Sequence, residues 1–93
     1  MKYQLAPELI KKLKRKDVRI RKSFRKALEI FFKDPLNLEL DNHKLEREWA
    51  GFRSIDVTAD LRAIYQEDSE GPEPVAYFVA LGTHKELYTK KST

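Results

Sequence analysis

Residue types that can transfer protons or bind phosphate are concentrated in the second half of the sequence. They are His43, Lys44, Glu46, Arg53, Asp60, Arg62, His84, Lys85 and Tyr88. Histidine acts as an acid or a base near neutral pH, and the guanidinium group of arginine binds phosphate oxygens in a bidentate fork. Cleavage of RNA by its own 2′-hydroxyl requires a base, a cation beside the phosphorus and an acid for the departing 5′ oxygen. This set therefore contains every group that a metal-free ribonuclease requires.

The same residues also have ordinary structural interpretations. His84 follows a Gly-Thr step and fits the end of a strand. Arg62 fits a strand edge, where it would pair with Asp60 or Glu67, and Tyr88 fits an aromatic cap on the core. From the residues alone, the sequence predicts a basic α+β domain that binds RNA or DNA, and it leaves open whether that domain is an enzyme.

The positive charge is concentrated toward the N-terminus. The whole chain has 19 Lys and Arg against 15 Asp and Glu, a net charge of +4. Residues 1–33 carry twelve of the basic side chains and three of the acidic ones, whereas residues 34–93 carry seven and twelve. A basic surface of this kind favours a polyanionic partner, because each neutralised phosphate releases condensed counterions. The alternative is a pair of helices whose outer face is simply solvated.

Two amphipathic helices are expected to carry this charge. After an extended start at residues 3–5, Pro7 suits a first helical turn, and apolar residues recur at helical spacing until about Lys16. Asp17 is expected to cap a second helix, which Asp34-Pro35 would end. The helical cations expected to bind RNA are Lys12, Arg15, Arg19 and Lys22.

Strand-like alternation begins after this helical part. Residues 52–57 and 61–66 form two expected strands, with Arg53 and Ile55 on one face of the first. A polar loop that contains glycine and proline follows, and residues 75–81 form a last strand that is apolar on both faces. The sheet cations expected to bind RNA beside the proton-transfer groups are Lys44, Arg53 and Lys85.

The segment between helices and strands, residues 36–51, shows no sustained period. We therefore expect a connection there, anchored by Leu45 and Trp49, with Trp49 and Phe52 holding the loop rather than stacking on bases. The predicted fold class is α+β, with an N-terminal helical hairpin packed on a small, curved, mainly antiparallel sheet of about four strands.

The composition limits the kinds of protein that this chain can form. At 93 residues it supports one domain, spanning residues 1–93. No apolar run approaches the ~20 residues of a membrane span, and the start lacks the apolar core of a signal peptide, so we expect a cytoplasmic protein. With no cysteine and two histidines, the sequence predicts neither a disulfide nor a metal site, and no cofactor is expected.

Two stretches together resemble a known family. HKLEREWAGFRSIDVTADLRAIYQ, residues 43–66, and VAYFVALGTHKELY, residues 75–88, are similar in order and spacing to the RelE/ParE superfamily of bacterial toxins, and most to its YafQ-like branch. The resemblance implies a RelE-like fold and endonucleolytic cleavage of messenger RNA on the ribosome. It also implies that a cognate antitoxin protein holds this activity in check.

The resemblance assigns roles to five residues. His84 matches the histidine that YafQ-like toxins use in proton transfer, and His43 and Asp60 match further active-site positions. Arg62 matches a phosphate-stabilising arginine of the RelE branch, and Tyr88 falls at the position of a functional aromatic residue.

Two positions depart from the family pattern. Asp56 stands where the YafQ prototype has a further histidine, and Ala80 stands where it has an arginine on the last strand. Arg62 or Arg53 would then supply the positive charge that position 80 lacks.

Two other functions remain open at this point. The superfamily also contains toxins that bind DNA gyrase and cleave no RNA, and an inactive relative would only bind RNA or its antitoxin. A gyrase inhibitor has no need of His43, Asp60 and His84 together, so the sequence favours the endonuclease. The absence of an arginine at Ala80 gives the inactive relative some weight.

Overall fold

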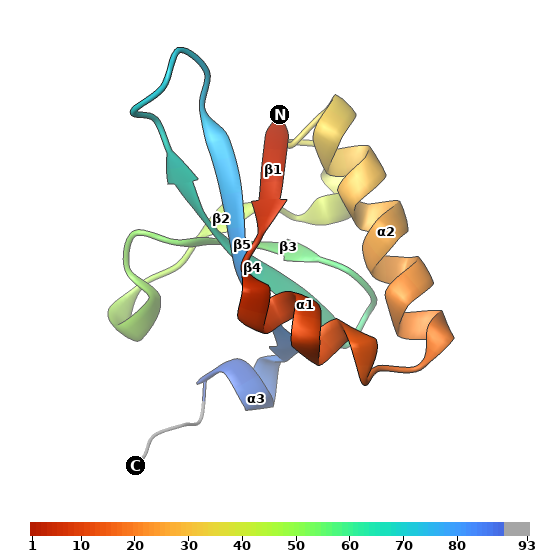
Figure 1. Ribbon diagram of the computed structural model, residues 1–93. Helices are drawn as coiled ribbons and strands as arrows, with labels where there is room; N and C mark the ends of the chain where they lie inside the picture. Colours follow the sequence, from red (N-terminus) through yellow and green to blue (C-terminus); the bar gives the residue numbers. More distant parts are fainter. Residues whose placement is uncertain (89–93) are drawn as a thin grey trace.

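A five-stranded sheet forms the centre of the molecule (Figure 1). The computed structural model describes residues 1–88. Across the sheet the strand order is β1-β5-β4-β3-β2, with β1 parallel to β5 and the other neighbours antiparallel. In chain order the elements are β1 (Lys2–Leu5), α1 (Pro7–Lys14), α2 (Val18–Lys33), the 3-10 helix η1 (Leu38–Leu40), β2 (His43–Lys44), the 3-10 helix η2 (Arg47–Trp49), β3 (Arg53–Asp56), β4 (Leu61–Asp68), β5 (Val75–Thr83) and α3 (His84–Tyr88).

Both long helices begin where the sequence predicts. Pro7 is the first residue of α1, and the Asp17 side chain caps α2 by accepting a hydrogen bond from the Ile20 N–H at 3.1 Å. α2 ends before Asp34-Pro35, as expected. α1 ends at Lys14 rather than near Lys16, because the next two N–H groups bond to carbonyls three residues back and tighten the last turn.

α2 supplies one wall of the hydrophobic core. Its Phe31 ring meets Tyr65 of β4 and Phe78 of β5 edge to face, with centroid distances of 5.1 and 5.3 Å. Phe24, further back along the same helix, also meets Phe78 edge to face. In Figure 1 the sheet stands between α2 on one side and the loop that contains η2 on the other. The core therefore fills one side of the sheet.

The opposite side of the sheet carries polar groups. Because Ile55, Ala63 and Tyr65 belong to the core, the alternate residues of the same strands must point away from α2. We call this side the far face and define it by Ser54 and Asp56 on β3, Arg62 and Ile64 on β4, and Ala80 and Gly82 on β5. Strand pairing arranges them in two rows: His43, Ser54, Ile64 and Ala80 form one, and Asp56, Arg62 and Gly82 form the other.

A β-bulge in β5 allows Phe78 to point into the core and Ala80 to lie on the far face. Ile64 pairs with Ala80 whereas Tyr65 pairs with Phe78, so Val79 is an extra residue on β5. Without this extra residue, strand alternation would place Phe78 and Ala80 on the same face of the sheet. Either Phe78 would then leave the core or Ala80 would leave the far face.

The α+β prediction is confirmed, with five strands in place of about four. β2 lies inside the segment that was expected to be an irregular connection, and a two-residue strand is too short to show a period. The expected extended start forms β1. β4 runs on to Asp68, and β5 runs to Thr83, where a short helix follows. Within residues 1–88, no helix has the length and apolar character needed to cross a bilayer.

Candidate active site on the far face of the sheet

An ion pair between neighbouring strands lies at the centre of the far face. Asp56, the last residue of β3, is opposite Arg62 of β4 in the antiparallel register. The Arg62 Nε lies 3.7 Å from Asp56 Oδ1, and about a third of each side chain is exposed. At this distance the two groups attract each other but form no hydrogen bond. The guanidinium group of Arg62 therefore keeps its donors for another partner.

Asp56 is an unusual carboxylate. Its Oδ1 is buried and has no hydrogen-bond partner among the described residues, and the same is true of the Ser54 hydroxyl on the same face of β3. Burial raises the pKa of the Asp56 carboxyl above its ordinary value. The positive charge of Arg62 opposes this rise, Asp41 adds to it, and His43 opposes it. Unsatisfied buried polar groups are rare and point to strain, chemistry or an absent partner.

His43 reaches this group from β2. Its Nδ1 lies 2.8 Å from the backbone carbonyl of Asp41, and the Asp41 carboxylate is 3.9 Å from the same nitrogen. A carbonyl oxygen only accepts hydrogen bonds, so Nδ1 carries the proton and Nε2 of the neutral ring is an acceptor. β2 places His43 opposite Ser54, which makes it a diagonal neighbour of Asp56 on the far face.

α3 brings the two C-terminal candidates to the same region. The helix starts with a capping box, a signal that the sequence Thr-His-Lys-Glu contains. The Thr83 N–H donates to Glu86 Oε1 at 2.8 Å, and the Glu86 N–H donates to Thr83 Oγ1 at 3.1 Å. Gly82 lets the helix fold back on the strand, since a Cβ at this position would lie 3.1 Å from Glu86 Oε1.

His84 and Tyr88 lie one turn apart on α3 and contact each other. Their ring centroids are 4.4 Å apart. Burial raises the pKa of the Tyr88 hydroxyl, and the positive charge of Arg62 opposes the rise. Arg62 pairs with Gly82, two residues before the start of α3, so the register of β4 with β5 places Arg62 beside this helix. Four of the five predicted catalytic residues, His43, Arg62, His84 and Tyr88, thus come together from β2, β4 and α3.

Asp60 is the predicted catalytic residue that stands apart. It lies in the exposed turn between β3 and β4, where its N–H donates to Thr58 Oγ1 at 3.2 Å. Within the described chain, no hydrogen bond or ion pair joins its carboxylate to the far-face group. The next residue, Leu61, pairs with Thr83, so Asp60 lies at the same end of the sheet as α3.

Arg53 has a structural task on the other side of β3. Its Nε donates to Asn42 Oδ1 at 2.7 Å, and Asn42 Nδ2 donates to the Tyr65 hydroxyl and to the Pro35 carbonyl, both at 2.9 Å. This network fastens the segment before β2 to the core. Arg53 therefore does not join Arg62, although both were expected near the same site. Its neighbour in the sheet, Lys44, is exposed on β2.

Trp49 and Phe52 anchor the η2 loop, as predicted. Their rings meet edge to face at 5.3 Å, and the Trp49 indole N–H donates to the Leu87 carbonyl of α3 at 3.0 Å. The loop thereby contacts the C-terminal helix and helps to fix it beside the sheet.

The helical cations that were expected to bind RNA are all exposed: Lys12, Arg15, Arg19 and Lys22. Lys12 and Arg15 line a hollow between α1 and β5 that Val79 and Ala80 also border. The positive charges of Lys16 and Lys12 help to lower the pKa of Glu86 on α3, after the larger effect of the Thr83 N–H hydrogen bond. The C-terminal end of α1 thus lies near the helix that carries His84. Lys85 is also exposed on that helix.

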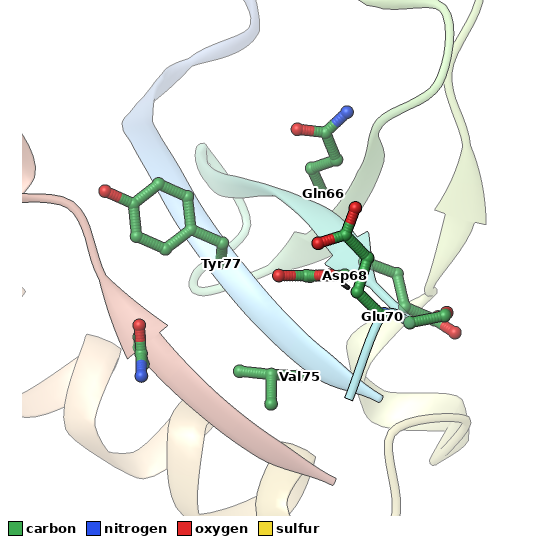
Figure 2. A pocket seen from close by; sticks show the side chains of 8 residues that line it. Gln66, Asp68, Glu70, Val75 and Tyr77 are labelled. Carbon is green, nitrogen blue, oxygen red and sulfur yellow. Dashed lines mark hydrogen bonds between the residues drawn. The ribbon is translucent and has the colours of Figure 1, made fainter. Parts of the chain in front are cut away.

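The opposite end of the sheet has the opposite charge. Figure 2 shows a hollow beside the loop that joins β4 to β5, with the carboxylates of Asp68 and Glu70 on its wall. Glu67 also lines it, and none of its lining residues is a cation. A polyanion would therefore be repelled here and attracted to the end where Arg62 and α1 lie.

Two participants were not found by reasoning from the sequence. Asn42 has no pattern that marks it, because its role depends on three partners that are distant in the chain. Asp56 departs from the family pattern in sequence, but its position beside Arg62 follows from the register of β3 with β4. The strand alternation did predict that Asp56 points away from Ile55.

Comparison with solved structures shows the same fold in bacterial and archaeal toxins. The YoeB/ParE toxin from Agrobacterium tumefaciens superposes with a TM-score of 0.68 at 20% identity, over 90% of this chain and 99% of that one. YafQ from E. coli strain BL21(DE3) gives 0.63 at 18% identity, over 92% and 96%. The RelB-RelE antitoxin-toxin complex from Methanococcus jannaschii gives 0.65 at 21% identity, over 90% and 93%.

The sequence itself identifies the family. No curated protein is significantly similar to this chain in sequence. A family model described as the bacterial toxin of the type II toxin-antitoxin system, YafQ, matches residues 4–89, which is nearly the whole length. The chain therefore belongs to the YafQ family of type II toxin-antitoxin toxins.

Proposed function

We propose that this toxin is a ribosome-dependent endonuclease that cuts messenger RNA through attack of the RNA 2′-hydroxyl. The observation that supports it best is the far-face group, in which His43, Arg62, His84 and Tyr88 approach one another from three elements. A fold that only bound its partner would have no need of an arginine and a histidine beside a buried carboxylate, with a second histidine on the adjoining helix.

Each side chain has a role that suits its surroundings. Arg62, which forms no hydrogen bond to Asp56, binds the scissile phosphate through its free donors. His84, exposed on α3 with its ring against Tyr88, protonates the departing 5′ oxygen. The acceptor for the 2′-hydroxyl proton lies on the β2–β3 side of Arg62, where the His43 Nε2 and the Asp56 carboxylate are found.

Ribosomal RNA and the message are bound by the basic side of the molecule. The charge comes from four exposed cations of α1 and α2, namely Lys12, Arg15, Arg19 and Lys22, and the positive charges at the end of α1 act on Glu86 of α3. The acidic end of the β4–β5 hairpin repels RNA and so favours one orientation.

A cognate antitoxin completes the system. The solved RelB-RelE complex and the DinJ-YafQ complex from E. coli contain an antitoxin on a toxin of this fold. For this chain we propose an antitoxin with an acidic segment, because an acidic chain neutralises the basic helices that RNA would otherwise occupy.

Expression of the toxin tests the proposed function. Induction should arrest growth, messages should be cut at defined positions within translated codons, and a co-expressed small acidic protein from the neighbouring reading frame should restore growth. Primer extension on several messages measures the cleavage, and a DNA supercoiling assay measures gyrase in the same cells. Growth arrest with intact messages and inhibited gyrase would establish the gyrase-binding activity instead.

A further inference from the structure

We propose that Asp56 is the general base of this site and takes the proton of the attacking 2′-hydroxyl. The inference rests on the proposed endonuclease function and assigns the one role that was left between two candidates. Three features of the far face carry it: the register with Arg62, the unsatisfied carboxylate oxygen, and the charged groups around that carboxylate.

The register places Asp56 nearer to the phosphate site than His43. Asp56 is directly opposite Arg62, whereas His43 lies one strand further away and in the next row. A phosphate that accepts hydrogen bonds from the Arg62 guanidinium therefore brings its ribose within reach of the Asp56 carboxylate. Effective proton transfer requires this proximity before any other property.

The carboxylate has free acceptor capacity. Its Oδ1 accepts no hydrogen bond in the described chain and stays 3.7 Å from Arg62 Nε, so neither ion pairing nor hydrogen bonding fully uses it. The Ser54 hydroxyl, on the same face of β3, is also unsatisfied and fully buried. About a third of the Asp56 side chain is exposed although Oδ1 is buried, so a substrate hydroxyl reaches the carboxylate from its exposed side.

The charges around Asp56 suit a base. Burial raises its pKa and thus makes the carboxylate more basic, while the positive charge of Arg62 opposes the rise. The charged and titratable groups that act on it are Arg62 from β4 and Asp41 and His43 from the β2 side.

The chemical step balances with the groups present. The O2′–H proton passes to the Asp56 carboxylate as the O2′ oxygen forms its bond to phosphorus, and the bond from phosphorus to the 5′ oxygen breaks. That oxygen takes a proton from His84. The products are a 2′,3′-cyclic phosphate and a 5′-hydroxyl, and solvent then restores both protonation states. His43 is left to accept or donate a hydrogen bond to the substrate.

Two substitutions at one position test the assignment. Asp56→Asn keeps the shape but removes the base, so single-turnover cleavage on programmed ribosomes should fall by roughly 10² to 10⁴-fold with ribosome binding unchanged. Asp56→His supplies a different base and should recover part of the rate. The cleavage rate of Asp56→His should then decrease as the pH falls through the ordinary histidine pKa of about 6.5. The rate of the unmodified toxin should decrease only at a lower pH.

A control and two opposing results complete the experiment. Asp68→Asn changes an exposed carboxylate at the far end of β4 and should leave the rate unchanged. An unaltered rate in Asp56→Asn would overturn the proposal. The proposal would also be overturned if the cleavage rates of Asp56→His and the unmodified toxin decreased over the same range of acid pH. This comparison tests the proposal even if Asp56→Asn does not fold. A toxin that cleaves no RNA before substitution would instead refute the proposed function.

Discussion

The possible role of His84 depends on the residues that surround it in the structure. Alone in the sequence it fits a strand end, but the structure places it at the first position of α3 with its ring against Tyr88. Tyr88 in turn lies within the field of Arg62. His43 gains a defined tautomer from the Asp41 carbonyl in the same way. Chemistry at this site therefore depends on pairs of residues rather than on single ones.

Removal of the His84 imidazole should slow cleavage without unfolding the toxin. His84→Ala should lower the single-turnover rate by roughly 10² to 10⁴-fold, because it removes the group proposed to protonate the 5′ oxygen. His84 is exposed, so truncation opens no core cavity, and thermal unfolding should be nearly unchanged. His84→Gln keeps the hydrogen-bonding capacity but cannot act as an acid, so it should lose as much activity as the alanine variant. Full activity in either variant would exclude His84 from the mechanism.

The sequence predicts those helices and strands whose positions are determined by residues close together in the chain. Pro7 and Asp17 mark the helix starts, and the alternation around Ile55 correctly separates the core side of β3 from the far side. β2 was not predictable, because two residues become a strand only through pairing with β3. The pairing of Asp56 with Arg62 was also not predictable, because it depends on the register between β3 and β4.

α3 is the element whose local stability the site needs most. Thr83→Ala removes the cap and should destabilise the protein by about 1 kcal/mol, the usual cost of losing such a cap. Cleavage should also fall, because His84 and Tyr88 both lie on this helix. Thr83→Ser retains the hydroxyl and serves as the matched control. Chemical denaturation and the cleavage rate measure the two effects, and an alanine variant as stable and active as the serine variant would show that the cap has no role.

The same cap gives a pH dependence with a definite sign. The Thr83 N–H hydrogen bond lowers the pKa of Glu86, so the ionised carboxylate stabilises the folded state above the ordinary carboxyl pKa. This contribution is lost as the pH falls through the lowered value. Between about pH 5.5 and pH 3, the melting temperature should therefore fall more steeply for the unmodified toxin than for Glu86→Gln. Parallel curves for the two proteins would remove Glu86 from the acid sensitivity.

Positive and negative charges are concentrated in different parts of the molecule. Residues 1–33 are strongly basic and residues 34–93 are acidic in total, and the fold turns this difference along the chain into a difference in space. The exposed cations lie on the helices, and the acidic hollow lies at the end of the β4–β5 hairpin. A molecule of this kind is oriented by a large polyanion before any specific contact forms.

Charge reversal on the helices should separate ribosome binding from chemistry. With Arg15, Arg19 and Lys22 all changed to Glu, half-maximal cleavage should need far more ribosomes, while the rate of the bound toxin should barely change. Lys12 is left intact in this triple variant, because its charge acts on Glu86 of α3 and its reversal would disturb the helix that carries His84. Adding Lys12→Glu should therefore lower the bound rate as well.

The salt dependence of binding provides the decisive measurement. If the three cations contact phosphates, the logarithmic slope of affinity against salt should become shallower by up to about 0.9 for each lost contact, with the duplex-DNA value as a guide. Lys33→Glu, an exposed reversal at the other end of α2 and outside the four cations expected to bind RNA, is the control for a reversal that breaks no phosphate contact and should leave the slope nearly unaltered. Sedimentation with ribosomes over a range of salt concentrations measures both. Equal slopes for the triple variant and the unmodified toxin would mean that this basic face is only solvated, and that the toxin reaches the ribosome through the sheet and α3 instead.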